Sequence, residues 1–219
     1  MELPALIETL RVHPDGSAPL LPWHLQRLQK SCQALGYRLD LEAWLDTLQQ
    51  HIALYPGQAR RMRMLHHADG HSSASSTPLT ELATPVTLTL APQPLAADRL
   101  LCHKTTYRPW FDEAQAFLQL QPKYFDIIFT DSQLWVLEGS RSNIYVQTGD
   151  GQWLTPPLRD NAVLPGVQRQ ALLDQGLVIE RAISLAELRQ ATGLRISNAL
   201  RGWQDACLAQ DDIDGSISR

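Results

Sequence analysis

Residues 101–114 read LCHKTTYRPWFDEA and place Lys104, one of the chain's three lysines, among polar and basic neighbours. The preceding stretch, PQPLAADR at 92–99, has the composition of a stiff connector. A boundary at this connector predicts a smaller N-terminal α/β domain, 1–95, and a larger C-terminal domain, 96–219, that carries Lys104. The question is whether this lysine is a solvated surface charge or a reactive amine.

Composition excludes several classes of function. The 219 residues include 19 Lys and Arg against 23 Asp and Glu, a net charge of −4. A partner with a phosphate backbone needs a basic surface, so we do not expect nucleic acid to bind. The sequence has neither a run of eighteen apolar residues nor the pattern of a secretion signal, and we expect a cytoplasmic protein without a membrane span.

Metal binding is not predicted either. The three cysteines are odd in number and far apart. His66, His67 and His71 lie in polar sequence, without acidic or thiol partners at ligand spacing. We therefore expect neither a disulfide framework nor a metal site.

Periodicity in the first domain predicts alternating strands and helices. The expected elements are a strand over 5–12, helices over 22–36 and 40–54, and strands over 59–67 and 86–92. In the strand ARRMRMLHH, alternation would place Arg61 and Arg63 on one face. The polar residues 68–85, rich in Ser, Thr and Pro, are expected to form an exposed loop.

The second domain is predicted to open with a helix over 109–120 and to continue as short strands. These strands are FDIIFTD, LWVLEG, NIYVQ and QWLTP, and TGDG at 148–151 gives the clearest hairpin signal between them. A helix follows over 164–176, and strand, helix and strand candidates alternate from 177 to 199.

Lys104 has two interpretations. Most lysines are solvated surface charges, but a lysine can also form a Schiff base with an aldehyde cofactor. That role requires a partly desolvated pocket and nearby cations that lower its pKa, and His103 and Arg108 are candidates for those cations.

The stretch VLEGSRSNIYV, 136–146, could serve the same cofactor. Glu138 ends one predicted strand, and a pyridine cofactor needs a carboxylate at its ring nitrogen to keep that nitrogen protonated. Ser140 and Asn143 add hydrogen-bonding groups beside it. An exposed Glu in a turn remains the alternative.

Phosphate recognition is suggested by LPGVQRQ, where a glycine at a helix start would present backbone N–H groups and the positive end of the helix dipole to an anion. Arg27 and the stretch SNALRG, 197–202, are further candidate contacts. An ordinary helix start is the alternative.

Seven segments in order resemble the class IV aminotransferase family of pyridoxal-phosphate enzymes. They are IETLRV, HLQRLQKSCQALG, RMRMLHHADG, HKTTYR, LEGSRSNIYV, LTPPLRDNAVLPGVQR and ISNALRG, and they span about residues 7 to 202. The family includes branched-chain and D-amino-acid aminotransferases and aminodeoxychorismate lyase. The resemblance implies an α+β fold of two domains, the fold-type IV fold, with pyridoxal 5'-phosphate as cofactor.

The resemblance also implies roles for residues. Lys104 matches the lysine that holds the cofactor and acts in catalysis, Glu138 matches the partner of the pyridine nitrogen, and Arg27 matches an arginine on the phosphate. The remaining matches are the Val167 and Gln168 amides at the phosphate, Ser140 and Asn143 beside the ring, Ser197 and Asn198 in a second phosphate loop, and Arg61 or Arg63 with Arg108 at the substrate carboxylates.

ETLRV, together with HKTT and a following Arg, is most similar to aminodeoxychorismate lyase, although Tyr107 and the stretch WQDA after ISNALRG depart from its pattern. The implied reaction converts 4-amino-4-deoxychorismate to 4-aminobenzoate and pyruvate, in a homodimer that binds a small amino substrate. An aminotransferase acting on a D- or branched-chain amino acid is the first alternative. An inactive relative that binds the cofactor is the second.

Overall fold

The structure is a computed structural model and describes residues 3–158 and 162–213. The chain forms two compact units, Met1–Glu81 with His103–Tyr107 and Leu82–Cys102 with Arg108–Arg219. This division differs from the expected boundary at residue 95. The strand Val86–Leu90 pairs within the sheet of the second unit, and the segment with Lys104 pairs with the first unit.

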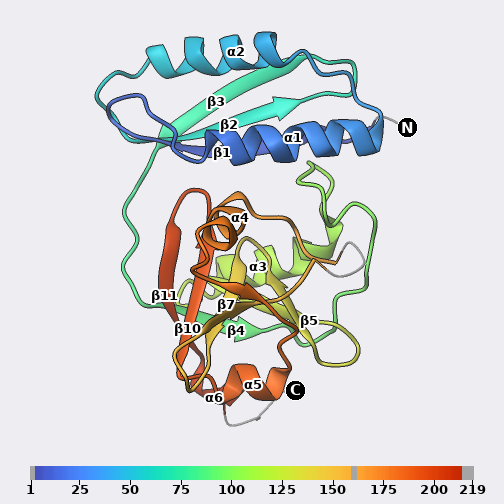
Figure 1. Ribbon diagram of the computed structural model, residues 1–219, viewed down its shortest axis with the longest axis vertical. Coiled ribbons are helices and arrows are strands. Elements are labelled where there is room, and N and C mark those ends of the chain that lie inside the picture. Colours follow the sequence, from blue (N-terminus) through green and yellow to red (C-terminus); the bar gives the residue numbers. More distant parts are fainter. Residues whose placement is uncertain (1–2, 159–161, 214–219) are drawn as a thin grey trace. The chain divides into compact units, whose positions relative to one another are not determined.

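The first unit contains a three-stranded antiparallel sheet and two helices (Figure 1). The strands are β1 (Leu6–Val12), β2 (Arg60–His66) and β3 (Ser72–Pro78), and β2 is the central one. The helices are α1 (Leu21–Leu35) and α2 (Leu41–Ala53). Local capping explains where α1 ends and where α2 begins. Gly36 takes a left-handed conformation (φ 71°) after α1, and the Asp40 side chain accepts a hydrogen bond from the Ala43 N–H (3.0 Å) at the start of α2.

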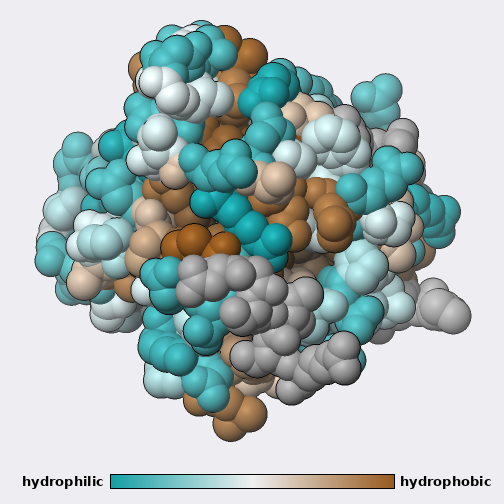
Figure 2. Space-filling view, turned by 90° about the horizontal axis from the view of Figure 1, so that it is seen from below, coloured by the Kyte–Doolittle hydropathy of each residue, from teal (hydrophilic) through white to brown (hydrophobic). Residues whose placement is uncertain are grey.

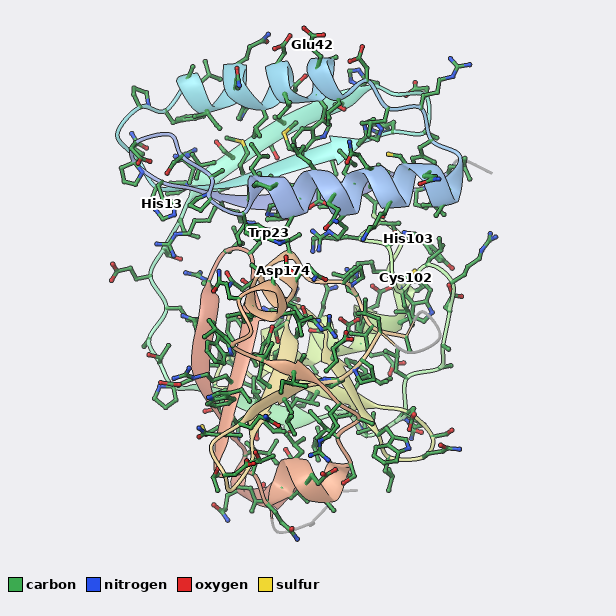
Figure 3. All side chains as sticks on the ribbon, viewed as in Figure 1. His13, Trp23, Glu42, Cys102, His103 and Asp174 are labelled. Atoms are coloured by element: carbon green, nitrogen blue, oxygen red, sulfur yellow. The ribbon has the colours of Figure 1, made fainter. Side chains whose placement is uncertain are left out.

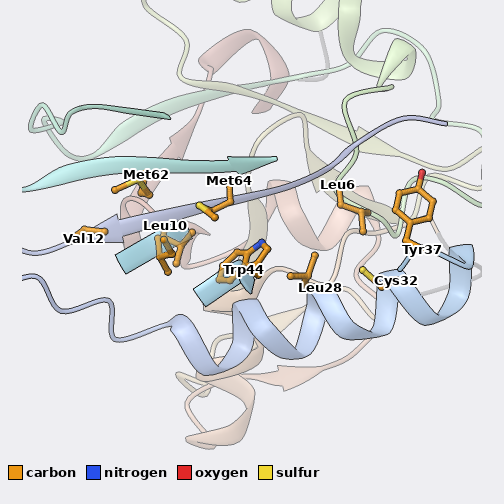
Figure 4. Close-up of a cluster of buried hydrophobic side chains, with 10 residues drawn as sticks. Leu6, Leu10, Val12, Leu28, Cys32, Tyr37, Trp44, Met62 and Met64 are labelled. Atoms are coloured by element: carbon orange, nitrogen blue, oxygen red, sulfur yellow. The ribbon is translucent and has the colours of Figure 1, made fainter. Parts of the chain in front are cut away.

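Side chains from both helices and two strands share one core in this unit (Figure 4). Leu10 on β1, Leu28 on α1, Trp44 on α2 and Met62 on β2 are almost fully buried in it. Alternation along β2 directs Met62 and Met64 into this core, so Arg61 and Arg63 share the opposite face, as predicted.

Strand β3 corrects one expectation. Residues 68–85 were expected to form a loop, yet Ser72–Pro78 pair with β2 along its whole length, from His66 opposite Ser72 to Arg60 opposite Pro78. Hydrogen bonding between backbones does not require apolar side chains, and β3 is an edge strand whose side chains are half-buried or exposed. A tight turn with Gly70 at φ 97° precedes it.

The second unit is built on an eight-stranded mixed sheet. In spatial order its strands are β6 (Val136–Gly139), β5 (Asp126–Thr130), β4 (Val86–Leu90), β11 (Gly202–Leu208), β10 (Gly193–Asn198), β7 (Asn143–Gln147), β8 (Trp153–Thr155) and β9 (Ile179–Glu180). Its helices are η1 (Pro109–Phe111), α3 (Asp112–Leu120), α4 (Val167–Asp174), α5 (Leu185–Arg189) and α6 (Gln210–Ile213).

Helices cover both faces of this sheet. Ile127 and Phe129 of β5 pack in the cluster that contains side chains of α3, whereas Ile128 between them packs in the cluster that contains Leu188 of α5. Tyr145 of β7 faces Leu172 of α4. Because neighbouring residues of a strand point to opposite faces, α3 and α4 lie on one face and α5 on the other.

Exposed apolar residues come from different parts of the second unit, among them Leu120, Leu134, Leu177 and Ile179. On the face drawn in Figure 2, hydrophobic side chains lie in separate groups between hydrophilic ones. Scattered apolar residues of this kind are normal for a protein surface. None of the helices in the described parts of the chain is long and apolar enough to cross a membrane.

Candidate active site

Lys104 lies on a short extended segment, His103–Tyr107, that runs beside β1. The Ile7 N–H donates to the Lys104 carbonyl (2.7 Å), and the Thr106 N–H donates to the Ala5 carbonyl (2.8 Å). Leu6 forms an antiparallel bridge with Thr105 between these two bonds. The backbone on both sides of Lys104 is therefore fixed against a strand, which is the support that a reactive side chain needs.

A buried ionic cluster lies on β1 and α1 of the same unit. Arg27 on α1 donates through Nε to Glu8 Oε1 (2.9 Å) and through Nη2 to Glu8 Oε2 (2.6 Å). His24, one turn earlier on α1, donates through Nδ1 to Glu8 Oε2 (2.5 Å). The bidentate contact between Arg27 and Glu8 sets the plane of the Arg27 guanidinium.

The charges of this cluster determine its protonation. Burial alone would raise the pKa of Glu8, but the positive charge of Arg27 and the hydrogen bond from His24 lower it to about 2. Burial lowers the pKa of His24, and the positive charges of Arg27 and Lys104 lower it further, against the opposing effect of Glu8. At neutral pH, Glu8 is therefore ionised and His24 is neutral.

His103 does not act as the cation expected beside Lys104. His103 is labelled in Figure 3. Its Nδ1 lies 2.9 Å from Ser31 Oγ on α1, and burial lowers its pKa. A histidine with a lowered pKa is neutral at neutral pH, so it adds no positive charge to the neighbourhood of Lys104.

In the second unit, Glu138 and Asn143 both bond the backbone of one residue, Leu164. Glu138, at the end of β6, is 3% exposed, and its Oε2 accepts from the Leu164 N–H (3.0 Å). Asn143, at the start of β7, donates through Nδ2 to the Leu164 carbonyl (3.1 Å). The loop that leads into α4 is thus fastened directly to the residue proposed to face a pyridine nitrogen.

The start of α4 has the features of an anion-binding helix terminus. Gly166 is the N-cap residue, and no side chain caps the first turn. A Cβ at Gly166 would lie 1.8 Å from Asn143 Oδ1, so only glycine fits there. The backbone N–H groups of Val167 and Gln168 belong to the first turn of the helix, where N–H groups have no partner within the helix.

The second predicted phosphate loop is the turn between β10 and β11. Asn198 Oδ1 accepts from the N–H groups of Leu200 (3.1 Å) and Arg201 (2.9 Å) and so shapes this turn. The Ser197 hydroxyl lies 2.7 Å from the Tyr145 hydroxyl, and both side chains are buried. Asn198 therefore organises the turn, while Ser197 contacts the packed side of the sheet.

The arginines predicted for substrate carboxylates lie in different surroundings. Arg61 is exposed and Arg63 is half-buried, and the strand register sets them opposite Arg11 and Thr9 of β1. Arg108, in the second unit, stacks on the ring of Phe111, with 4.7 Å from its Cζ to the ring centroid. Arg11 was not singled out from the sequence, although its position opposite Arg61 follows from the antiparallel pairing of β1 and β2.

A cavity of about 420 Å³ lies where β4 and β5 begin in the second unit, with Lys123, Phe125 and Arg141 in its lining. None of the predicted site residues lines it. This cavity therefore adds nothing to the predicted site.

Three polar residues that sequence reasoning did not select are central to these clusters, namely Glu8, His24 and Asp126. Asp126 accepts hydrogen bonds from the hydroxyls of Ser140 and Ser142. A signal existed for both acids. Glu8 occurs on the same side of its strand as Leu6 and Leu10, and Asp126 begins a strand of apolar residues. A charge at a position that the pattern assigns to the core requires a partner.

Known proteins support the resemblance. The sequence profile of the family described as Amino-transferase class IV matches residues 5–208. A protein of Schizosaccharomyces pombe named "Putative aminodeoxychorismate lyase" is 31% identical over 170 residues, which are 76% of this chain and 72% of that protein.

Two solved structures illustrate the shared fold. One, described as a "Putative amino-acid aminotransferase" from Mesorhizobium loti, is 33% identical with a TM-score of 0.87, over 94% of this chain and 99% of that one. The other is 4-amino-4-deoxychorismate lyase from Pseudomonas aeruginosa, with 24% identity, a TM-score of 0.76, and coverage of 94% of this chain and 83% of that one.

These likenesses confirm the predicted family and the predicted α+β fold of fold-type IV. They also confirm the predicted kind of enzyme and the cofactor that such enzymes use, pyridoxal 5'-phosphate. The chain belongs to the class IV aminotransferase family of pyridoxal-phosphate-dependent enzymes.

Proposed function

We propose that this chain is a pyridoxal-phosphate-dependent lyase that converts 4-amino-4-deoxychorismate to 4-aminobenzoate and pyruvate. The observation that carries the proposal is the pairing of a strand-bound Lys104 with the Glu8–Arg27 cluster in a chain whose curated relative bears a lyase name. The reaction is an elimination, and the two products together contain the same atoms as the substrate. A proton leaves the amine-bearing ring carbon, the ether C–O bond breaks, and the released enolpyruvyl group takes up a proton to become pyruvate.

The described residues have the chemistry that pyridoxal phosphate needs. They include a primary amine on a fixed backbone, a buried carboxylate and a helix start without a side-chain cap. Gly166 also fits, because a side chain at the mouth of α4 would occupy the space of Asn143 Oδ1. When bound, the cofactor supplies an aldehyde for amines and a protonated ring that withdraws electrons from the substrate carbon.

Each residue then has a task. Lys104 Nζ would hold the cofactor through its aldehyde, and the same amine would take the proton from the substrate carbon. The Glu138 carboxylate would keep the proton on the ring nitrogen. The family resemblance assigns Arg27 and the Val167 and Gln168 N–H groups to the phosphate, and each would suit that role because a guanidinium and a helix N-terminus both favour anions.

The remaining predicted residues orient the ligand. Ser140 and Asn143 shape the segment beside the ring, and Ser197 and Asn198 shape the second phosphate loop. Arg63, half-buried on β2, is our first choice for a substrate carboxylate, ahead of the exposed Arg61 and of Arg108 on Phe111.

The assay that tests the reaction mixes purified protein, pyridoxal phosphate and 4-amino-4-deoxychorismate and follows 4-aminobenzoate and pyruvate. Equal amounts of both products, lost in a Lys104→Ala variant, are expected. Absence of both products would contradict the lyase assignment.

A second function is favoured by the Mesorhizobium loti structure, whose description names an amino-acid aminotransferase and whose fold matches over nearly its whole length. In that case the chain would move an amino group from a D- or branched-chain amino acid to a keto acid. The same protein preparation, offered such amino acids with 2-oxoglutarate, should then form glutamate. A protein that binds the cofactor but catalyses neither reaction would be an inactive relative.

Cofactor attachment has its own test, because the chain has only three lysines, Lys30, Lys104 and Lys123. Borohydride reduction of the protein loaded with cofactor, followed by peptide mapping, should label Lys104. Lys30 and Lys123 serve as internal controls. A label on either control, or no label, would contradict the assignment.

We further propose that the protein acts as a cytoplasmic homodimer in folate biosynthesis, as the resemblance to aminodeoxychorismate lyases implies. Sedimentation velocity at micromolar concentration should give the mass of two chains of 24.6 kDa. An active monomer would contradict the homodimer.

A further inference from the structure

Asp126 is a fully buried carboxylate at the start of β5, and four hydrogen-bond donors surround it. Oδ1 accepts from Ser140 Oγ (2.6 Å) and from the Ile127 N–H (2.9 Å). Oδ2 accepts from Ser142 Oγ (2.5 Å) and from the Arg141 N–H (3.2 Å). Three of these donors belong to residues 139–143, here called the 139–143 segment, so the carboxylate is the centre around which this segment folds.

The backbone of the 139–143 segment depends on the same arrangement. The Gly139 N–H donates to the Ser142 carbonyl (2.8 Å), which closes the turn, and the Ser140 N–H donates to the Ile127 carbonyl (3.2 Å). A Cβ at Gly139 would lie 2.3 Å from Asp126 Oδ2 and 2.8 Å from Ser142 Oγ. The carboxylate therefore occupies the space above Gly139 and leaves no room for a side chain there.

Asp126 and its four donors, here called the Asp126 cage, are joined to the candidate site by a short chain of contacts. Glu138 precedes the 139–143 segment directly and accepts from the Leu164 N–H, and Asn143 at its end donates to the Leu164 carbonyl. Leu164 lies two residues before Gly166, where α4 begins. A change in the 139–143 segment would thus reach both the Glu138 carboxylate and the start of α4.

We propose that Asp126 is a positioning residue whose carboxylate fixes the 139–143 segment and, through it, the direction of the Glu138 carboxylate and the start of α4. Burying a carboxylate is costly, and here the cost is offset by donors that all come from the one stretch of chain next to Glu138 and from β5 itself. The proposal rests on the proposed function only for the identity of the ligand, since the cage exists in the protein alone.

The test compares Asp126→Asn with Asp131→Asn. Asp131 lies just beyond the other end of β5, and its Oδ1 accepts from the Gln133 and Trp135 N–H groups (2.9 Å each). This control therefore makes the same substitution in a turn at the opposite end of the strand. Three quantities are measured. The first is hydrogen–deuterium exchange of peptides covering 139–143 without cofactor, the second is the affinity for added pyridoxal phosphate, and the third is the absorption maximum of the bound cofactor.

In Asp126→Asn, one donor-facing oxygen becomes an NH₂ group that the Ser or N–H donors cannot bond. We expect exchange in the 139–143 segment to rise at least tenfold, affinity for pyridoxal phosphate to fall about tenfold or more, and the absorption maximum to shift, because the Glu138 carboxylate is displaced. Asp131→Asn should leave all three unchanged. Parental affinity and absorption in Asp126→Asn, whatever its exchange, would overturn the positioning role.

Should Asp126→Asn fail to fold, Ser142→Ala and Ser142→Thr decide instead. The Ala variant loses the hydroxyl that donates to Oδ2 and should show the same changes in part, while the Thr variant retains a hydroxyl and should restore parental values. Equal behaviour of the two would overturn the proposal. If the parent protein binds no pyridoxal phosphate, the proposed function fails, whereas unchanged exchange in Asp126→Asn would be a separate failure of the cage.

Discussion

Glu8 in the first unit and Asp126 in the second are buried carboxylates next to residues that we assign to the cofactor, but their hydrogen-bond partners differ. Glu8, 4% exposed, faces Arg27 and His24, whereas Asp126, 0% exposed, faces hydroxyl and backbone N–H groups. Burial raises the pKa of both. The charge of Arg27 outweighs burial and lowers the pKa of Glu8 to about 2, while the pKa of Asp126 stays raised despite its hydrogen bonds.

The difference shows that depth of burial does not decide the charge of an acid; the charge of its partner does. It also separates two ways of supporting a site. Glu8 compensates and orients a positive charge, so its loss should be an electrostatic loss. Asp126 gathers neutral donors from one turn of chain, so its loss should be a loss of local shape.

The largest expected effect is that of Glu8→Gln. Removing the negative charge leaves the buried Arg27 guanidinium without the carboxylate on its Nε and Nη2 edge, and such a change costs about 3–5 kcal/mol of unfolding free energy. Chemical denaturation at pH 7 measures it. The control is Asp205→Asn at the Arg195–Asp205 pair, where Asp205 is 64% exposed and the loss should stay below about 1 kcal/mol. Equal losses of unfolding free energy in the two variants would contradict an electrostatic role for Glu8.

The pH dependence of stability should differ in sign between the two acids. The pKa of Glu8 lies below its ordinary 4.5, so its contribution is complete above pH 4.5 and is lost as the pH falls toward 2. The pKa of Asp126 lies above its ordinary 3.8, so its contribution is present in acid and is lost as the pH rises from 3.8 through the folded-state pKa.

Denaturation curves collected between pH 2 and pH 6 test this opposition. Between pH 6 and pH 2, the unfolding free energy of Glu8→Gln should fall by about 3 kcal/mol less than that of the parent, at about 1.4 kcal/mol per unit of pKa. That of Asp126→Asn should fall by more than that of the parent. Curves of both variants that run parallel to the parent would show that neither pKa is shifted by folding.

The two regions also differ in how far sequence reasoning could reach. The helix predicted over 22–36 is found at Leu21–Leu35, because a helix with one buried face carries its periodicity in the sequence. The polar strand β3 was mistaken for a loop, because its pairing with β2 uses backbone groups that the side chains of Ser72–Pro78 do not reveal.

The site shows the same limit. Lys104, Glu138 and Arg27 could be named because motifs resembling those of a known family fall on them. The side chains that bond Glu8 lie 16 and 19 residues away in the sequence, and the hydroxyls that bond Asp126 lie 14 and 16 residues away. Only the folded chain brings them together. A buried acid in an apolar strand predicts that a partner exists, but it does not say which residue that partner is.

The electronic role of Glu138 gives an intermediate effect. Glu138→Gln keeps an oxygen that can accept from the Leu164 N–H but loses the charge that would keep the ring nitrogen protonated. We expect cofactor binding near that of the parent and a kcat lower by about a hundredfold or more, which corresponds to about 2.7 kcal/mol. Arg27→Ala should do the reverse, with weakened cofactor binding and activity largely restored by excess cofactor. A Gln variant that regains full activity when cofactor is resupplied would make Glu138 a structural residue.

The smallest expected effect isolates the shape of the Asp126 cage, without any change of charge. Gly139→Ala adds one methyl group where it would lie 2.3 Å from Asp126 Oδ2, and crowding of this kind costs about 1–3 kcal/mol because the carboxylate or the turn must move. Gly149→Ala, in the turn between β7 and β8, meets no atom within 4 Å and is the matched control, expected within about 0.5 kcal/mol of the parent. Both free energies come from denaturation at pH 7. If Gly139→Ala is as stable as Gly149→Ala, the carboxylate has room to move, and the 139–143 segment is shaped by its backbone hydrogen bonds rather than by Asp126.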